Sequence, residues 1–330
     1  MTMRLRRFII LIILLGAAQV SNAAAQAVSS RKYNKYALTN SGASNISSNT
    51  VTQLGFNPKR GQIWLGTGKG LNFTTGGGKN YSQINTFPRF NQNGIFALAV
   101  RSDTIWLSTA YTSSKQGNPV TGDGMMFSLD GGSNWESLPQ PLDKPNDTVQ
   151  YYGINALKAL PIIVPEQNVI YDLAIGPRPG MVWAATWSGG IRRSMDNGKT
   201  WERVVLPPTG KQTVAPTDTL KFILEPKRGS GGDLVFLGFS TLASSDGAVW
   251  VGTVDGLCKS VDAAAAYPSW VKFNRAFGGL SGNWVTAIKE QPPGTSRPRA
   301  ILAATWPAED SREYYEGKGY QSSFTSWLGR

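Results

Sequence analysis

Two short segments of the chain carry the same reactive side chains at the same spacing. The pattern Ser-x-Asp-x-Gly-x-x-Trp is formed once by Ser128, Asp130, Gly132 and Trp135, and again by Ser194, Asp196, Gly198 and Trp201. A hydroxyl two residues from a carboxylate could belong to a nucleophilic site or to a cation site, because both need such oxygens close together. The same residue types are common in tight turns, so the pattern alone leaves chemistry and architecture open.

The composition of the chain narrows the chemistry that these segments could perform. There is no histidine, which excludes Ser-His-Asp and Cys-His catalysis and zinc sites that use histidine. Cys258 is the single cysteine, so the chain has no disulfide framework, and we expect this residue to be a small buried side chain. No loop has the alternating acidic ligands of an EF-hand. We therefore expect no cofactor and no metal, and an enzyme would have to use Asp, Glu, Tyr, Lys or Arg.

Both segments belong to a longer unit that recurs along the chain. Worn copies of the pattern start at Thr74 and Ser260. A second motif, Ile or Val followed by Trp, stands upstream of each copy and contains Trp64, Trp106, Trp183 and Trp250. A fifth version begins at Ile301 without a Trp at the second position. Further upstream, apolar and polar residues alternate, as is typical of half-buried strands, at residues 49–54, 93–98, 168–173 and 283–288.

Short strands repeated in groups of four predict an all-β fold, a β-propeller of four-stranded blades. About five units are visible, near residues 48–90, 91–140, 165–206, 230–275 and 282–330, within a repeat domain at 28–330. The last unit lacks its pattern, so we favour a fragment of a larger propeller over completion of this unit by residues 35–40. Residues 151–162 are the one segment that could be a helix. The proline-rich segments 207–216 and 292–298 are predicted to be surface loops between units.

The Ser-x-Asp-x-Gly-x-x-Trp pattern has a structural interpretation in such a fold. Asp can accept hydrogen bonds from backbone N–H groups a few residues on, and Gly supplies a positive φ. Trp buries a large ring against the turn while its ring N–H finds an acceptor. A hairpin held in this way would recur once per blade, because each blade needs the same turn.

The two well-formed segments resemble the Asp-box (BNR) repeats of sialidase-like propellers, and the segments around Trp64 and Trp250 resemble two-component-regulator-type propeller repeats. The resemblance covers about residues 48–306 at the level of the repeat. It implies that the boxes lie at the blade periphery, away from the central site. On that basis Asp130 and Asp196 are expected to be structural rather than catalytic.

The N-terminus has the features of a secretory signal. Residues 1–27 combine three arginines, an apolar stretch too short to span a bilayer comfortably, and small residues at the cleavage positions. We therefore expect a periplasmic or extracellular protein with no membrane span after cleavage. The net charge of +12 becomes +9 when three arginines are removed, and the basic residues are scattered. Scattered charge in an exported chain argues against nucleic-acid binding.

These observations favour a secreted binding or scaffold module whose partner is a glycan, a peptide or an envelope protein. Its contact loops would be residues 111–124 and 143–167. One alternative is a glycoside hydrolase of the sialidase or xyloglucanase type, which needs two carboxyl groups about 5 to 10 Å apart. Asp172 is the one carboxylate that we place near a central channel, and the Arg-Ile-Pro motif of sialidases is absent. The other alternative is the sensor propeller of a larger signalling protein.

Overall fold

The computed structural model describes residues 46–75, 77–84, 93–227, 231–294 and 297–306. The predicted leader at 1–27, the segment 35–40 and residues 307–330 lie outside these ranges. The described residues form antiparallel sheets joined by turns, so the predicted all-β class is confirmed. Their single helical element is the short 3-10 turn η3 (Leu234–Phe236). No helix in the described ranges has the length and apolarity that a membrane crossing requires.

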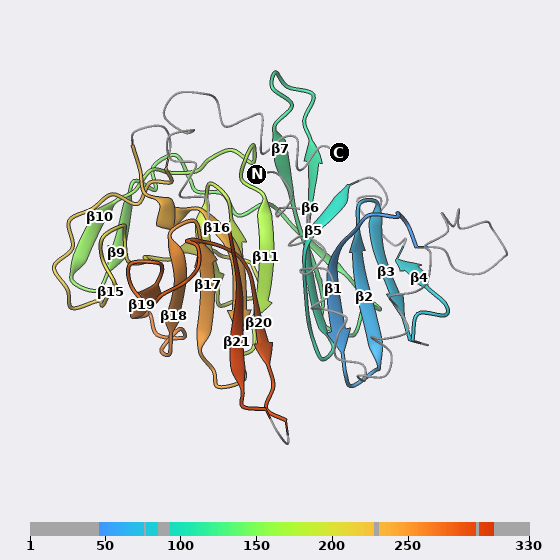
Figure 1. The fold of residues 1–330 in the computed structure, drawn as a ribbon. Coiled ribbons are helices and arrows are strands. Elements are labelled where there is room, and N and C mark those ends of the chain that lie inside the picture. The colour runs from blue at the N-terminus through green and yellow to red at the C-terminus, as the bar shows by residue number, and fades with distance from the viewer. Residues whose placement is uncertain (1–45, 76, 85–92, 228–230, 295–296, 307–330) are drawn as a thin grey trace, which may run out of the picture. The chain divides into compact units, whose positions relative to one another are not determined.

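The first two sheets each contain four strands that follow one another in chain order (Figure 1). The first sheet consists of β1 (Val51–Asn57), β2 (Gln62–Thr67), β3 (Gly70–Thr74) and β4 (Ser82–Ile84). The second consists of β5 (Gly94–Arg101), β6 (Thr104–Thr112), β7 (Val120–Ser128) and β8 (Glu136–Leu138). The hairpin of β6 and β7 projects beyond β5, as Figure 1 shows.

The next sheets repeat the same order of strands. The third consists of β11 (Ile170–Ile175), β12 (Val182–Thr186), β13 (Gly190–Ser194) and β14 (Glu202–Arg203). The fourth consists of β16 (Gly238–Ala243), β17 (Val249–Thr253), β18 (Gly256–Ser260) and β19 (Trp270–Phe273), with β15 (Thr213–Val214) added beside β19. The last described pair is β20 (Trp284–Gln291) and β21 (Ala300–Trp306).

The first strand of each sheet lies beside the first strand of the next. β1 contacts β5, β5 contacts β11, β11 contacts β16, and β16 contacts β20. Each of these strands has a register shift near its start, for example between Ile170 and Asp172 and between Gly238 and Ser240. A bulge of this kind adds local twist to a strand, which suits sheets stacked around their inner strands. This arrangement of four-stranded sheets is that of β-propeller blades.

The segment 151–162 is not a helix, and that interpretation was wrong. It contributes to a hairpin of β9 (Val149–Tyr152) and β10 (Asn155–Lys158). The burial alternates with a period of two, since Asn155 and Leu157 are buried while their neighbours in β10 are exposed. Gly153 takes a φ of 56° in the two-residue turn, a conformation that favours glycine.

The two proline-rich segments also differ from the prediction. Pro207 and Pro208 are buried, and the same segment contributes β15 to the edge of the fourth sheet. Residues 292–294, 297 and 298 are exposed, as predicted for a surface loop, but they lie between β20 and β21 of one sheet rather than between two sheets. The first segment is drawn inward because Lys272 binds its backbone carbonyl groups, as described below.

Candidate functional site

The two complete boxes are turns that join the third strand of a sheet to the fourth. In the first, Ser128 Oγ donates to Asp130 Oδ1 at 2.8 Å and accepts from the backbone N–H of Gly132 at 2.8 Å. Asp130 also accepts from the backbone N–H groups of Ser133 and Asn134, each at 2.9 Å. These hydrogen bonds lower the pKa of Asp130 to about 2, and those from Asn134 have the largest effect. The side chain is therefore a charged acceptor within the turn.

The second box repeats these contacts with different neighbours. Ser194 Oγ donates to Asp196 Oδ1 at 2.9 Å, and Thr200 donates to Asp196 through its backbone N–H at 2.9 Å and its hydroxyl at 2.7 Å. The ring N–H of Trp201 donates to the carbonyl oxygen of Gly198 at 3.0 Å, as Trp135 does to Gly132 at 2.9 Å. The oxygens of both boxes are therefore used inside their own turns.

Each box also packs against the preceding sheet. A Cβ atom added to Gly132, whose φ is 92°, would lie 2.6 Å from Trp64 of β2. One added to Gly198, whose φ is 76°, would lie 2.8 Å from Trp106 of β6. Trp64 and Trp106 are 1% and 0% exposed. The box glycine is thus needed both for its backbone conformation and for close contact with the tryptophan of the neighbouring sheet.

The worn box at Ser260 uses an arginine from the preceding sheet. It has no glycine, but Arg193 of β13 donates to the carbonyl oxygens of Ala263 and Ala265 at 2.7 Å each. The same guanidinium lies 5.7 Å from the ring centroid of Trp183 in β12, and Trp183 is fully buried. Trp250 of β17 is half-buried, with the ammonium of Lys259 at 5.0 Å from its ring. Sequence reasoning missed this role of Arg193, although the Arg-Arg pair just before a box was visible.

We expect Asp196→Ala to lower the free energy of unfolding by about 1 to 2 kcal/mol, because three donors, the hydroxyl of Ser194 and the N–H and hydroxyl of Thr200, lose their acceptor. Thermal unfolding followed by circular dichroism measures the change. Lys199→Ala is the matched control, since its side chain is exposed in the same turn. Equal melting temperatures for the two variants would contradict a structural role for the box carboxylate.

Asp172 links the first strand of one sheet to the first strand of the next by a hydrogen bond. Its carboxylate in β11 accepts from the backbone N–H of Leu173 and from that of Thr241 in β16, each at 2.9 Å. Comparable bonds link the other neighbours, such as Gln53 to the carbonyl oxygen of Phe96 at 3.1 Å and Ser240 to that of Val285 at 2.9 Å. Asp172 therefore occupies a position that is used for contact between sheets.

The surroundings of Asp172 affect its ionisation. Although the residue keeps some exposed surface, burial of the carboxyl group raises its pKa to about 6, against the opposing effect of Lys289 and the two backbone donors. The pKa of an Asp in the unfolded chain is about 3.9. The folded protein therefore binds a proton here between about pH 4 and pH 6 that the unfolded chain releases.

This difference predicts a pH dependence with a definite sign. Stability contributed by protonated Asp172 is present below the unfolded pKa and is lost as the pH rises from about 4 through about 6. The variant Asp172→Asn should lack this fall in urea denaturation curves recorded across that interval. Asp246→Asn is a control of opposite sign, because a hydrogen bond from Ser244 lowers the pKa of Asp246. Parallel pH profiles for wild type and Asp172→Asn would refute the assignment.

The described residues enclose a groove of about 550 Å³, which we call the loop groove. One wall comes from the tip of the β6–β7 hairpin (Gln116, Gly117, Pro119) and another from residues 161–167. Trp187 and Ser188, between β12 and β13, and Pro226, Lys227 and Leu237 complete the lining. Both loops proposed from the sequence as contact loops thus line this groove.

Contacts between the two loops hold the groove in shape. The backbone N–H of Gln167 donates to Val120 at 2.8 Å, and that of Gly122 donates to Pro165 at 3.0 Å. Lys115 and Glu166 form an ion pair across the same interface. Glu166 is the one carboxylate among the described lining residues, and Asp172 is not part of the lining. Within the described ranges, no group of three His, Cys, Asp or Glu side chains is placed to hold a metal.

A buried cluster of charges fixes residues 143–162 to the third sheet. Asp143 accepts from Arg192 of β13 and from Arg203 of β14, and it also accepts from the backbone N–H of Ile162 at 2.7 Å. The three charged side chains are 2%, 8% and 7% exposed for Arg192, Arg203 and Asp143. Burial opposes ionisation of Asp143, but the hydrogen bond and charge of Arg192 outweigh it, so its pKa is lowered.

A second buried charge lies in the fourth sheet. The ammonium of Lys272 in β19 is fully buried and donates to Asp255 Oδ2 at 2.6 Å. It also donates to the carbonyl oxygens of Pro207 and Pro208 at 3.1 and 2.8 Å. An ammonium group has three donors, and all three are used here. Lys272 therefore fastens the segment that begins at Pro207 to the outer strand of the sheet.

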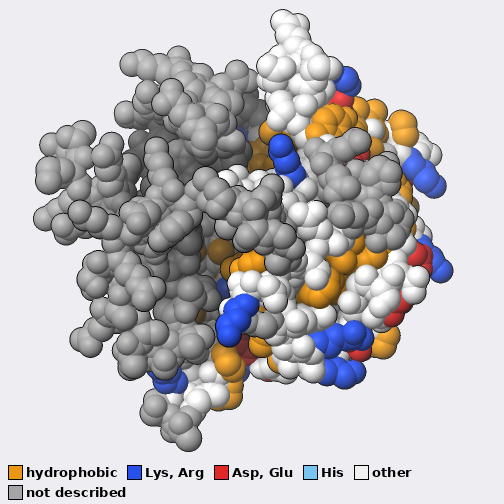
Figure 2. Space-filling model, turned by 90° about the vertical axis from the view of Figure 1, so that its right-hand side faces the viewer, with side chains coloured by type: hydrophobic (Ala, Val, Ile, Leu, Met, Phe, Trp, Pro, Cys, Tyr) orange, Lys and Arg blue, Asp and Glu red, His pale blue; other side chains and the backbone are white. Residues whose placement is uncertain are grey.

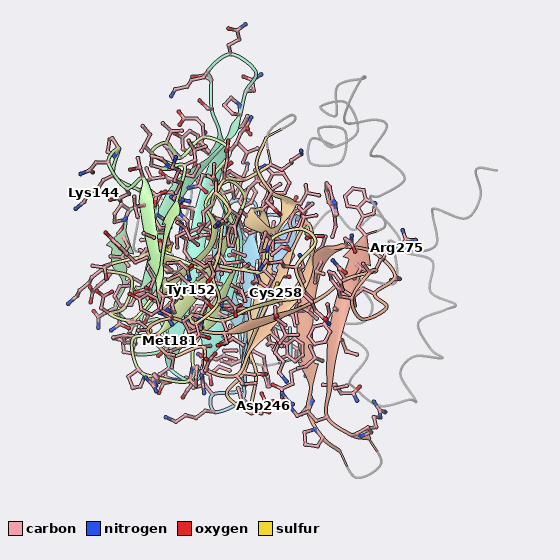
Figure 3. The ribbon with its side chains drawn as sticks, turned by 90° about the vertical axis from the view of Figure 1, so that its left-hand side faces the viewer. Lys144, Tyr152, Met181, Asp246, Cys258 and Arg275 are labelled. Carbon is pink, nitrogen blue, oxygen red and sulfur yellow. The ribbon has the colours of Figure 1, made fainter. Side chains whose placement is uncertain are left out.

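The surroundings of Cys258 and the distribution of surface charge agree with what the sequence predicts. Cys258 of β18 is fully buried among apolar side chains that include Tyr152 (Figure 3), and burial raises the pKa of its thiol to about 12. A thiol with so high a pKa is a poor nucleophile. On the uncovered part of the face in Figure 2, Lys and Arg side chains are scattered, with Asp, Glu and neutral side chains between them.

Comparison with known proteins gives a limited sequence match. No protein-family model matches the chain. An oligoxyloglucan-reducing end-specific xyloglucanase of Emericella nidulans is 28% identical over 193 residues, which are 55% of this chain and 22% of that protein. The chain thus spans a small part of the length of the curated relative that it matches.

Solved structures show a likeness to β-propellers. An ancestral GH74 enzyme shares 14% identity at a TM-score of 0.42, over 79% of this chain and 39% of that one. YCF48 bound to D1 peptide shares 16% identity at a TM-score of 0.35, over 66% of this chain and 65% of that one. At these identities the likeness concerns the propeller fold alone.

Proposed function

We propose that this chain is a binding or scaffold propeller whose contact site is the loop groove. The observation that carries the proposal is the convergence of two insertions, one extending β6 and β7 and the other before β11, on one partly apolar cavity. Binding sites in proteins are commonly concave and combine apolar side chains with polar groups, and this groove is lined by both. Loops held by a rigid sheet scaffold are the usual place for such sites.

The chemistry of the groove favours binding over hydrolysis. A glycosidase places two carboxyl groups about 5 to 10 Å apart at the bond it cleaves. In the described lining the carboxylate is Glu166, which is paired with Lys115, and Asp172 is held by two backbone N–H groups elsewhere. Neither carboxylate is therefore placed at the groove as one of the free pair that hydrolysis needs.

A glycoside hydrolase is the second candidate, and the sequence match to a xyloglucanase favours it. In that case Asp172, with its raised pKa, is the residue to test. Release of sugar from xyloglucan oligosaccharides that is abolished in Asp172→Asn, while the variant stays folded, would support the hydrolase. Binding without turnover supports the first proposal.

A direct test of the loop groove uses Trp187→Ala. Glycan arrays and a panel of short peptides are probed with the wild type, with this variant, and with Tyr151→Ala as an exposed aromatic control outside the groove. We expect ligands of the wild type to bind the control equally and Trp187→Ala at least about tenfold more weakly. Circular dichroism verifies that Trp187→Ala is folded. Equal binding by all three proteins would overturn the assignment of the groove.

The proposal includes export of the protein, which rests on the sequence of residues 1–27. The partner would then be a glycan, a peptide or an envelope protein outside the cytoplasm. N-terminal sequencing of the protein isolated from its natural host tests this. A mature chain that starts near residue 28 supports export, whereas a chain that keeps Arg4 and Phe8 contradicts cleavage.

A further inference from the structure

The wall of the loop groove contains a short extended segment bounded by two prolines. Pro161, Ile162, Ile163, Val164 and Pro165 run from the buried cluster at Asp143 to the outer side of β7. Prolines at both ends favour extended backbone in the residues that precede them. Glu166 continues the segment and forms an antiparallel bridge with Thr121 of β7. The segment therefore lies at the free edge of the extended β6–β7 hairpin.

The backbone of this segment is only partly paired. Ile162 exchanges hydrogen bonds with Asp143, since its N–H donates to the carboxylate at 2.7 Å and its carbonyl accepts from the backbone N–H at 2.9 Å. In the described part of the chain, the N–H and C=O groups of Ile163 and Val164 have no protein partner. An edge with such groups is a template for another extended chain. The flanking prolines confine it to two residues, which suits a short peptide rather than a long added strand.

The side chains beside this edge define what it would accept. Ile163 and Val164 are 47% and 50% exposed and face the groove together with the ring of Trp187 and with Leu237. Of the two described charges in the lining, Glu166 is neutralised by Lys115, whereas Lys227 forms no ion pair with a described carboxylate. Among the described residues, the groove therefore offers apolar contacts, backbone hydrogen-bonding groups and one positive charge, Lys227, without a paired carboxylate.

We propose that the loop groove binds an extended peptide with apolar and acidic side chains, whose backbone pairs with that of Ile163. This deepens the proposed function, on which it rests, by naming the class of partner. The peptide backbone supplies affinity along the edge, and alternate side chains enter the apolar lining. An acidic side chain or a C-terminal carboxylate meets Lys227. A glycan could use Trp187 but could not pair as a strand.

The test uses a fluorescent peptide of alternating Val and Thr that ends in Glu, together with a version that ends in Lys. We expect the acidic peptide to bind the wild type and the basic version to bind at least about tenfold more weakly. Ile163→Pro removes the N–H of the edge without breaking an internal hydrogen bond and should weaken binding by about tenfold or more, whereas Ile163→Val should not. Lys227→Met should weaken binding and reduce its salt dependence.

Hydrogen exchange of the complex provides the second measurement. The amide of Ile163 should exchange rapidly in the free protein and at least about tenfold more slowly with the acidic peptide bound. The amide of Val164 points to the other side of an extended segment and serves as the internal reference. Equal affinity of Ile163→Pro and Ile163→Val, or exchange unchanged by the peptide, overturns strand pairing. Binding of a xyloglucan oligosaccharide that needs Trp187 but leaves the Ile163 amide unprotected overturns this inference and retains the proposed function. Absence of any Trp187-dependent ligand overturns both.

Discussion

Replacing Lys272 with methionine should lower the free energy of unfolding by about 3 to 5 kcal/mol, the cost of leaving a buried charge without its partner. The ammonium group donates to Asp255, Pro207 and Pro208, and the methionine side chain offers these three acceptors no donor. Asp255, whose side chain is 6% exposed, would lose its ion-pair partner. Urea denaturation of the two proteins measures the difference.

Two further variants separate the lost charge pair from lost packing. The double variant Lys272→Met with Asp255→Leu removes both charges and should recover much of the stability, since apolar replacements of buried pairs are often neutral. Lys259→Met, on the neighbouring strand, changes a partly exposed lysine and should cost less than about 1 kcal/mol. If Lys272→Met were as stable as Lys259→Met, the contacts of Lys272 with Asp255, Pro207 and Pro208 would contribute nothing to stability.

Asp143→Asn should lower the free energy of unfolding by about 3 to 5 kcal/mol, because it leaves buried positive charges without their partner. Arg192 and Arg203 would both keep their buried charge, and the amide cannot neutralise either. Because Asp143 also accepts from Ile162, the loss should free the segment that forms one wall of the loop groove. We expect faster proteolysis within residues 143–165 as well as a lower midpoint in urea.

The pH dependence and a surface control complete this prediction. The pKa of Asp143 is lowered in the folded protein, so its contribution is present above the unfolded pKa of about 3.9 and is lost as the pH falls through the folded value. The variant should show a smaller loss of stability in acid. Asp103→Asn removes an exposed carboxylate paired with Arg60 and should change stability little. Equal effects of the two substitutions would contradict the buried cluster.

The fold could be predicted because its information is local and repeated. Alternating segments, the Trp motif and the box recur in one order, and each marks a strand or turn by its own residue types. The hairpin at 149–158 was missed because its apolar residues were fitted to a helix, although Gly153 fits the two-residue turn that the structure shows. In a short segment, period two and period 3.6 are hard to distinguish.

The buried charges could not be predicted, because their partners are distant in sequence. Arg192 and Asp143 are 49 residues apart, and Lys272 and Pro207 are 65 apart. A lone Lys or Asp in a turn-rich sequence is ordinarily a solvated surface residue. Asp172 was placed near the centre from its strand, but its bond to Thr241 depends on which strand lies beside β11. The loop groove was predictable only as two long insertions, since its lining depends on how those insertions meet.

Because each box packs on the tryptophan of the sheet before it, the two ends of the row of sheets are not equivalent. The Trp of one sheet is covered by the box of the next sheet, since Gly132 covers Trp64 and Gly198 covers Trp106. The box of each sheet therefore packs on the sheet that precedes it in the chain. Loss of a sheet from the C-terminal side would therefore uncover a large indole, but loss from the N-terminal side would leave a box with nothing to cover. In an open stack whose stability is a sum over neighbours, this asymmetry makes the two ends unequal, because the last unit leaves its indole uncovered whereas the first leaves its box unused.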